Sequence, residues 1–134
     1  MLKKVSSKFL LVGTLGLTMI APTVAFADYQ GYQAYALYSF QRDNYTNTHD
    51  KETNEDYIKN HVITLTDTDK AIFWAAKPDN TKISNNYTQN QGNTTNINFK
   101  SGFNLSQNDQ VKMGLKNAHL KTSNAFVTGE VDFK

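Results

Sequence analysis

The sequence predicts an all-β fold, a small antiparallel two-layer β-sandwich of six or seven strands, preceded by a cleaved signal peptide. Three observations predict it. Short segments with alternating apolar and polar side chains recur along the chain, stretches rich in Asn, Asp, Thr and Gly separate them, and no segment favours a helix strongly. In a chain of this length, that pattern is typical of a two-layer sandwich, with a small barrel as the alternative.

The N-terminus has the features of a secretory signal. Lys3, Lys4 and Lys8 precede an apolar run at 9–20, and small residues at Ala25 and Ala27 follow it. The run of about 12 residues is shorter than the ~20 that a membrane-spanning helix needs. We therefore expect residues 1–27 to be a signal peptide cleaved after Ala27, and residues 28–134 to be one secreted domain without a stable membrane span.

Charge and cysteine content exclude several classes of function. Of the 14 basic residues, three lie in the signal, which leaves eleven against 12 acidic residues and a net charge of −1 for residues 28–134. This balance argues against a nucleic-acid partner. The absence of cysteine excludes disulfides, thiol catalysis and zinc–thiolate sites. A cysteine-free exported domain behind a lysine-rich signal suits a Gram-positive bacterium.

The first part of the secreted chain combines a tyrosine-rich segment with a polar one. Tyrosines recur every three residues from Tyr29 to Tyr38, which fits either one face of a helix or a strand that runs from Tyr32 to Phe40. Aromatic enrichment favours the strand. We expect a polar loop at about 41–60, in which the acidic residues and Lys51 form a solvated face.

Two apolar strands follow the loop. Residues 61–66 alternate and are rich in β-branched side chains, and residues 71–77 carry apolar side chains on both faces. The polar connection at 67–70 predicts an antiparallel hairpin between them. The second strand is predicted to be an interior one, with Trp74 as its packing anchor.

Shorter segments complete the expected sheets. Residues 106–118 fit either a strand or a helix that begins at Ser106, but Gly114 and Asn117 favour the strand. In the closing strand, alternation places Asp132 toward solvent. The remaining predicted strands are 81–84, 96–100, 110–116 and 125–133.

A search for chemistry finds no strong motif. His49, His61 and His119 lie in three separate segments, so a metal or catalytic triad would need the fold to bring them together. Asp67 and Asp69 are the best calcium candidates, although a polar turn explains them equally well. No phosphate loop or nucleophile motif occurs. We therefore predict no enzyme, no catalytic residues, no cofactor and no metal site.

Several short motifs carry a family resemblance: the signal ending 25–27, the start 29–32, the core 72–77 with 80–84, the turn 91–92 and the strand 111–115. With them the chain resembles domain-of-unknown-function family 2712, small secreted proteins of Gram-positive bacilli. The resemblance implies a secreted single-domain protein. It implies no functional residues, because the family has none assigned that match.

The polar 41–60 segment and the tyrosine-rich first strand favour surface recognition, since Tyr and Asn side chains suit adaptable binding. The predicted function is therefore a secreted, non-enzymatic binding or interaction module at or outside the cell surface. The alternative is a secreted bacteriocin-like toxin built on a cysteine-free β-sandwich. An exported hydrolase is a third hypothesis and rests only on carboxylates of unknown placement.

Overall fold

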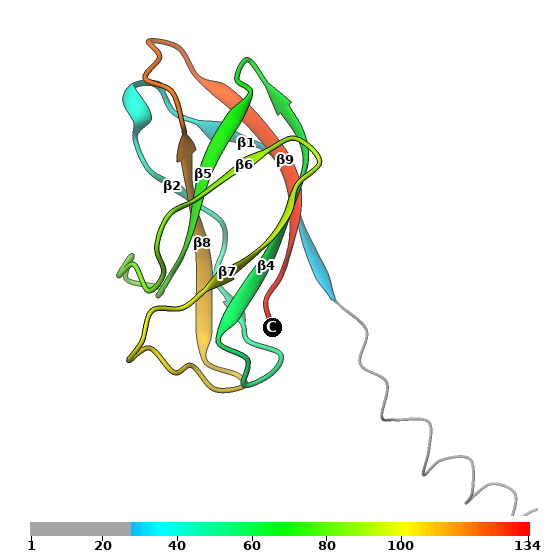
Figure 1. Cartoon of the computed structure of the whole chain (residues 1–134), viewed down its shortest axis with the longest axis vertical. Coiled ribbons are helices and arrows are strands. Elements are labelled where there is room, and N and C mark those ends of the chain that lie inside the picture. The colour runs from blue at the N-terminus through cyan, green and yellow to red at the C-terminus, as the bar shows by residue number, and fades with distance from the viewer. Residues whose placement is uncertain (1–27) are drawn as a thin grey trace, which may run out of the picture.

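The computed structural model describes residues 28–134, which form two antiparallel sheets packed face to face (Figure 1). The prediction of an all-β sandwich is confirmed. Its strands are β1 (Tyr29–Leu37), β2 (Asn44–Tyr45), β3 (His49–Asp50), β4 (Tyr57–Thr66), β5 (Lys70–Ala76), β6 (Tyr87–Asn90), β7 (Thr94–Asn98), β8 (Gln110–Asn117) and β9 (Ala125–Asp132). One short 3-10 turn, η2 (Ser39–Gln41), follows β1.

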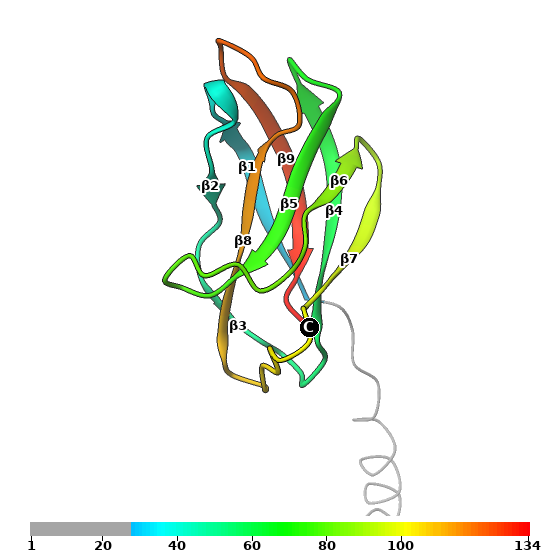
Figure 2. The same ribbon diagram turned by 60° about the vertical axis from the view of Figure 1, so that its left-hand side comes forward.

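The two sheets have different strand orders. The first runs β1-β9-β4-β7, and the second runs β2-β8-β5-β6 with β3 also paired to β8. Figure 2 shows the second sheet in front of the first, and β1 begins at the same end of the sandwich where β9 stops. Within residues 28–134, no helix is long and apolar enough to cross a membrane. The predicted signal peptide and its cleavage site after Ala27 lie outside the described residues.

The core lies between the sheets and is built by alternation along each strand. In β8 the side chains of Val111, Met113 and Leu115 are fully buried in it, which confirms the strand interpretation of this segment over the helical one. In β5 the core-facing residues include Phe73 and Ala75. The described residues thus form a closed domain with a core of their own.

Trp74 is buried, but it lies outside that core. It is only 1% exposed, yet it points away from the inter-sheet cluster that contains Phe73. Its partner in the register is Gly114 of β8, and a Cβ atom there would lie 2.1 Å from the Trp74 ring. The ring therefore lies flat over a glycine on the outer face of the second sheet, while β5 is the interior strand that was predicted.

The predicted hairpin between residues 61–66 and 71–77 is wrong. β4 pairs with β9 and β7, whereas β5 pairs with β8 and β6. The connection at 67–69 instead crosses from one sheet to the other, with Asp67 at φ 66°. Sheets pack about 10 Å apart, a gap that three residues can span, so a short polar link does not by itself specify a hairpin.

The polar segment at 41–60 is more structured than predicted. β2 and β3 both pair with β8, and β4 already begins at Tyr57. Lys51 is only 1% exposed. Its buried ammonium donates a hydrogen bond to the Glu55 carbonyl and lies 5.3 Å from the Phe99 ring centroid. The expectation of a solvated face is therefore wrong for Lys51.

Two further differences come from irregular pairing. A register shift between Tyr32 and Tyr35, with Ala34 at φ 51°, turns both tyrosines toward the core despite their odd spacing. The predicted strand at 81–84 makes only isolated bridges, at Lys82 and Ser84, and the longer pairing with β5 is made by β6.

Candidate functional site

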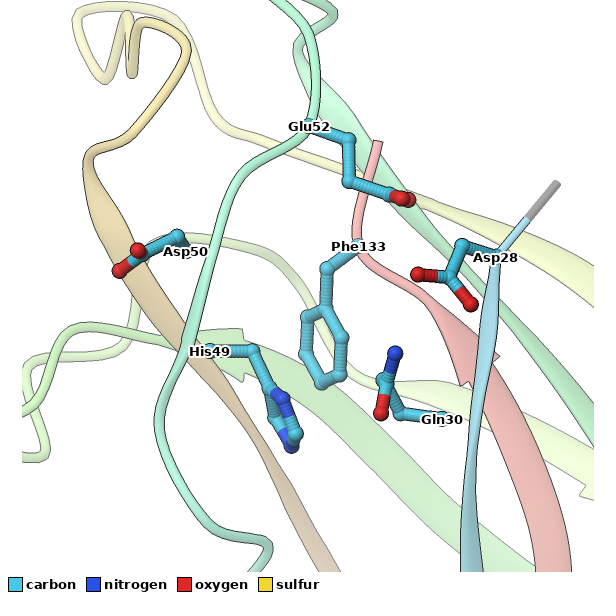
Figure 3. A pocket seen from close by; sticks show the side chains of 6 residues that line it. All are labelled: Asp28, Gln30, His49, Asp50, Glu52 and Phe133. Atoms are coloured by element: carbon cyan, nitrogen blue, oxygen red, sulfur yellow. The ribbon is translucent and has the colours of Figure 1, made fainter. Parts of the chain in front are cut away.

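A pocket of about 220 Å³ opens at the end of the sandwich where β1 begins and β9 stops (Figure 3). Its walls come from three places in the sequence: the start of β1, the β3 segment and the residue after β9. A smaller cavity of about 70 Å³ continues from it along β1 and shares three of its residues. The lining residues of the larger pocket are Asp28, Gln30, His49, Asp50, Glu52 and Phe133.

The 49–52 segment is held in place because it bridges the two sheets. His49 and Asp50 pair with β8 of the second sheet, and the Lys51 backbone N–H donates to the Asp109 carbonyl at 2.8 Å. The Glu52 N–H then donates to the Phe133 carbonyl at 2.9 Å, directly after β9 of the first sheet. Backbone hydrogen bonds on both sides therefore fix the wall of the pocket.

An aromatic stack forms the floor of the pocket. The rings of His49 and Phe133 lie 4.5 Å apart between centroids, at an interplanar angle of 20°. Phe133 is almost completely buried, and burial also lowers the pKa of His49, with the negative charge of Asp50 acting in the opposite direction. The imidazole therefore favours its neutral form, which stacks well on a phenyl ring.

Carboxyl groups gather on one side of this floor. Figure 3 shows the Glu52 and Asp28 side chains reaching toward the same side of Phe133, whereas Asp50 turns away. The pKa of Glu52 is raised to about 7, first by partial burial and then by its interaction with Asp132 and the negative charges of Asp132 and Asp28, whereas Lys134 acts in the opposite direction. Glu52 is thus a carboxyl group that takes up or releases its proton near neutral pH.

Asp132 is the most unusual member of the group. The prediction that it faces solvent is wrong, because its carboxylate is buried and neither oxygen has a hydrogen-bond partner among the described residues. The nearest cation is the Lys134 ammonium, at 3.8 Å. When Glu52 is protonated it has an O–H to donate to Asp132, and when it is ionised two carboxylates face each other.

Of the residues singled out in the sequence, His49 lines the pocket, and the others lie outside its lining. Asp69 accepts a 2.6 Å interaction from the ring of His119, which lowers the pKa of Asp69, and the Asp67 carbonyl accepts a hydrogen bond from Lys121. His61 contacts the Thr94 hydroxyl at 2.7 Å. No group of three or more His, Cys, Asp or Glu residues within 28–134 is arranged to hold a metal ion. The three histidines do not converge.

Sequence reasoning missed the pocket because its residues are unremarkable one by one. Glu52 was interpreted as part of a solvated face and Asp132 as a solvent-facing strand residue, and Phe133 was only the last residue of a predicted strand. The only signal in the sequence was an acidic stretch in each of two distant segments, near 52–56 and 130–132.

Comparison with known proteins adds no assignment: no protein-family model and no curated protein matches the chain.

Proposed function

We propose that the protein is an exported, non-catalytic binding module that acts at or outside the cell surface, and that its end pocket receives a cationic group of the partner. The observation that carries this proposal is the excess of carboxylates at the pocket. Asp28, Glu52 and Asp132 interact there, and Lys134 is the only cation among the groups that act on Glu52.

A bound ammonium or guanidinium group would relieve this excess of negative charge. It would favour the ionised form of Glu52 by the same charge interaction that Lys134 already makes. The stacked rings of His49 and Phe133 supply an apolar and aromatic floor, on which the aliphatic part of a lysine or arginine side chain packs well. The pocket volume of about 220 Å³ suits a side chain of that size better than a whole small-molecule ligand.

The smaller cavity extends the same surface along the edge strand β1. Tyr32 and Tyr35 line it from one side and Thr46 and Asn47 from the other. A partner segment that places its cationic side chain in the end pocket would therefore continue along polar and tyrosine side chains, which suit adaptable contacts. This arrangement supports recognition of a basic peptide segment.

The test uses residues 28–134 and two short peptides, acetyl-Gly-Lys-Gly-amide and its neutral counterpart with Gln in place of Lys. Backbone amide shifts should move at residues 50–52 and at Phe133 with the lysine peptide only. Glu52→Gln should abolish this response, and Glu55→Gln, a change of the same kind outside the pocket lining, should leave it intact. Equal shifts with both peptides would refute the proposal.

A further inference from the structure

A second charged surface lies on the outer face of the second sheet, over the strand pair β5–β8. Three ammonium groups lie above two aromatic rings there, and we call this set of residues the lysine face. The Nζ atom of Lys82 lies 4.5 Å from the Trp74 ring centroid and that of Lys116 lies 5.9 Å from it. The Nζ atom of Lys112 lies 4.5 Å from the ring centroid of Tyr45.

The two rings below these ammonium groups contact each other. Tyr45 meets Trp74 edge to face, with centroids 6.0 Å apart and an interplanar angle of 89°. Trp74 lies flat over Gly114, where a side chain would collide with it. The Nζ atoms of Lys82 and Lys116 lie over the same ring, so the distance between them cannot exceed the sum of their distances to its centroid. Two positive charges are therefore held close to each other.

The β5–β6 connection helps to hold the lysine side chains in place. The Lys112 ammonium donates to the Pro78 carbonyl at 2.9 Å, and the Lys82 ammonium donates to the Asn86 side chain at 2.8 Å. Both acceptors belong to this connection, which can be followed in Figure 2 between β5 and β6. Neutral acceptors thus orient the ammonium groups without neutralising their charge.

Carboxylates do not balance the lysine face. Among residues 28–134 the ion pairs are His119 with Asp69 and Lys134 with Asp132, and neither includes a lysine of this face. Burial lowers the pKa of Lys82, the positive charge of Lys116 lowers it further, and Asp43 is the one acidic group that opposes them. Unbalanced positive charge on an ordered surface attracts an anion.

We propose that the lysine face binds a phosphodiester polymer that carries no bases, such as a poly(glycerol phosphate) chain. Lysine ammonium groups bind phosphate as point charges, and three of them on one surface suit a polymer with one negative charge per repeat. Trp74 is only 1% exposed, so it offers neither an open ring for a nucleobase to stack on nor an apolar side chain to insert into a lipid surface. The lysine face is separate from the end pocket, and this inference does not depend on the function proposed for that pocket.

The structure supplies a built-in reporter for the test, because Trp74 is the only tryptophan of the chain and lies directly below two of the ammonium groups. Residues 28–134 are titrated at low salt with poly(glycerol phosphate), and binding is followed by tryptophan fluorescence and by co-sedimentation. Lys82→Gln with Lys116→Gln should weaken binding about tenfold, and the slope of log affinity against log salt should fall by roughly 0.7 for each lost contact. Asp43→Asn should strengthen binding.

The matched control removes the same charge elsewhere. At a salt concentration of about 0.15 M, where the Debye length is about 8 Å, Lys59→Gln with Lys121→Gln should leave binding within about twofold of the unsubstituted protein. Poly-glutamate, a single-stranded oligonucleotide and phosphatidylglycerol vesicles are tested at equal charge concentration. Failure to bind poly(glycerol phosphate), an equal loss in both double variants, or binding of any other anion at least as tight would overturn the proposal. Glu52→Gln, which disables the end pocket, should leave polymer binding unchanged.

Discussion

Gly114→Ala tests the packing of the only tryptophan on the outer face of the second sheet. The added Cβ would lie 2.1 Å from Cε2 and 2.3 Å from Nε1 of Trp74, distances at which the ring must move. The ring has little freedom to do so, because it is 1% exposed and meets the Tyr45 ring at 6.0 Å. Overpacking of this kind costs about 1–3 kcal/mol, and alanine recovers roughly 0.5–1 kcal/mol over glycine within a strand.

We therefore expect the Gly114→Ala variant to lose about 1–2 kcal/mol of unfolding free energy, which corresponds to a Tm lower by roughly 5–15 °C in a domain of this size. Urea titration followed by far-UV circular dichroism measures it without relying on the displaced tryptophan. Gly31→Ala is the matched control, since a Cβ at that strand position meets nothing within 4 Å. Adding Trp74→Leu to Gly114→Ala should recover part of the loss. If Gly114→Ala is as stable as Gly31→Ala, the ring does not lie where we place it.

Three further predictions concern other parts of the chain. Partial burial and the neighbouring carboxylates raise the pKa of Glu52 from 4.5 to about 7, so its favourable contribution is complete below pH 4.5 and is lost as pH rises through 7. Glu52→Gln should leave stability unchanged at pH 4 and raise it at pH 8, by less than about 1 kcal/mol because much of the side chain is exposed and water screens its charge. An equal effect at both pH values in urea titration would contradict this. Tyr32→Phe removes the hydroxyl that donates to the buried Asn60 at 2.8 Å, and calorimetry should find a loss of about 1–2 kcal/mol, whereas an unchanged Tm would contradict it. Expression of the full chain in a Gram-positive host should yield a secreted protein that begins at Asp28 by mass spectrometry, and a cell-bound, uncleaved chain would refute the export prediction.

Local alternation was enough to predict the sandwich and the faces of its regular strands. Val111, Met113 and Leu115 illustrate this, since their period of two places all three in the core. Trp74 was correctly expected to be buried, but alternation says only that it points opposite to Phe73. It does not say which of the two faces is the core when both are apolar, and Gly114, the residue that makes room for the ring, is 40 positions away in the sequence.

The sequence alone could not show which strands pair with each other. The pairing of β4 with β9 rather than β5 depends on contacts between residues 60 or more positions apart, and a short polar link permits either arrangement. The pocket depends even more on distant contacts, because the hydrogen bond from Glu52 to Phe133 joins the first half of the chain to its last residues. Asp132 becomes buried only through such neighbours, so no local pattern could distinguish it from Glu130.

Residues 28–134 have a net charge of −1, but they carry two surfaces of opposite charge. The two binding proposals can therefore be tested separately. The end pocket gains negative charge as pH rises through 7, because Glu52 ionises there, so its affinity for a lysine peptide should increase over that range. A phosphodiester keeps a single negative charge across the same range, so binding of poly(glycerol phosphate) at Lys82 and Lys116 should not follow that rise. Salt weakens both interactions, because it screens the charges at the pocket and opposes the release of counterions from the polymer. A pH series at constant salt therefore assigns each interaction to its surface, and a common pH profile would mean that one surface carries both.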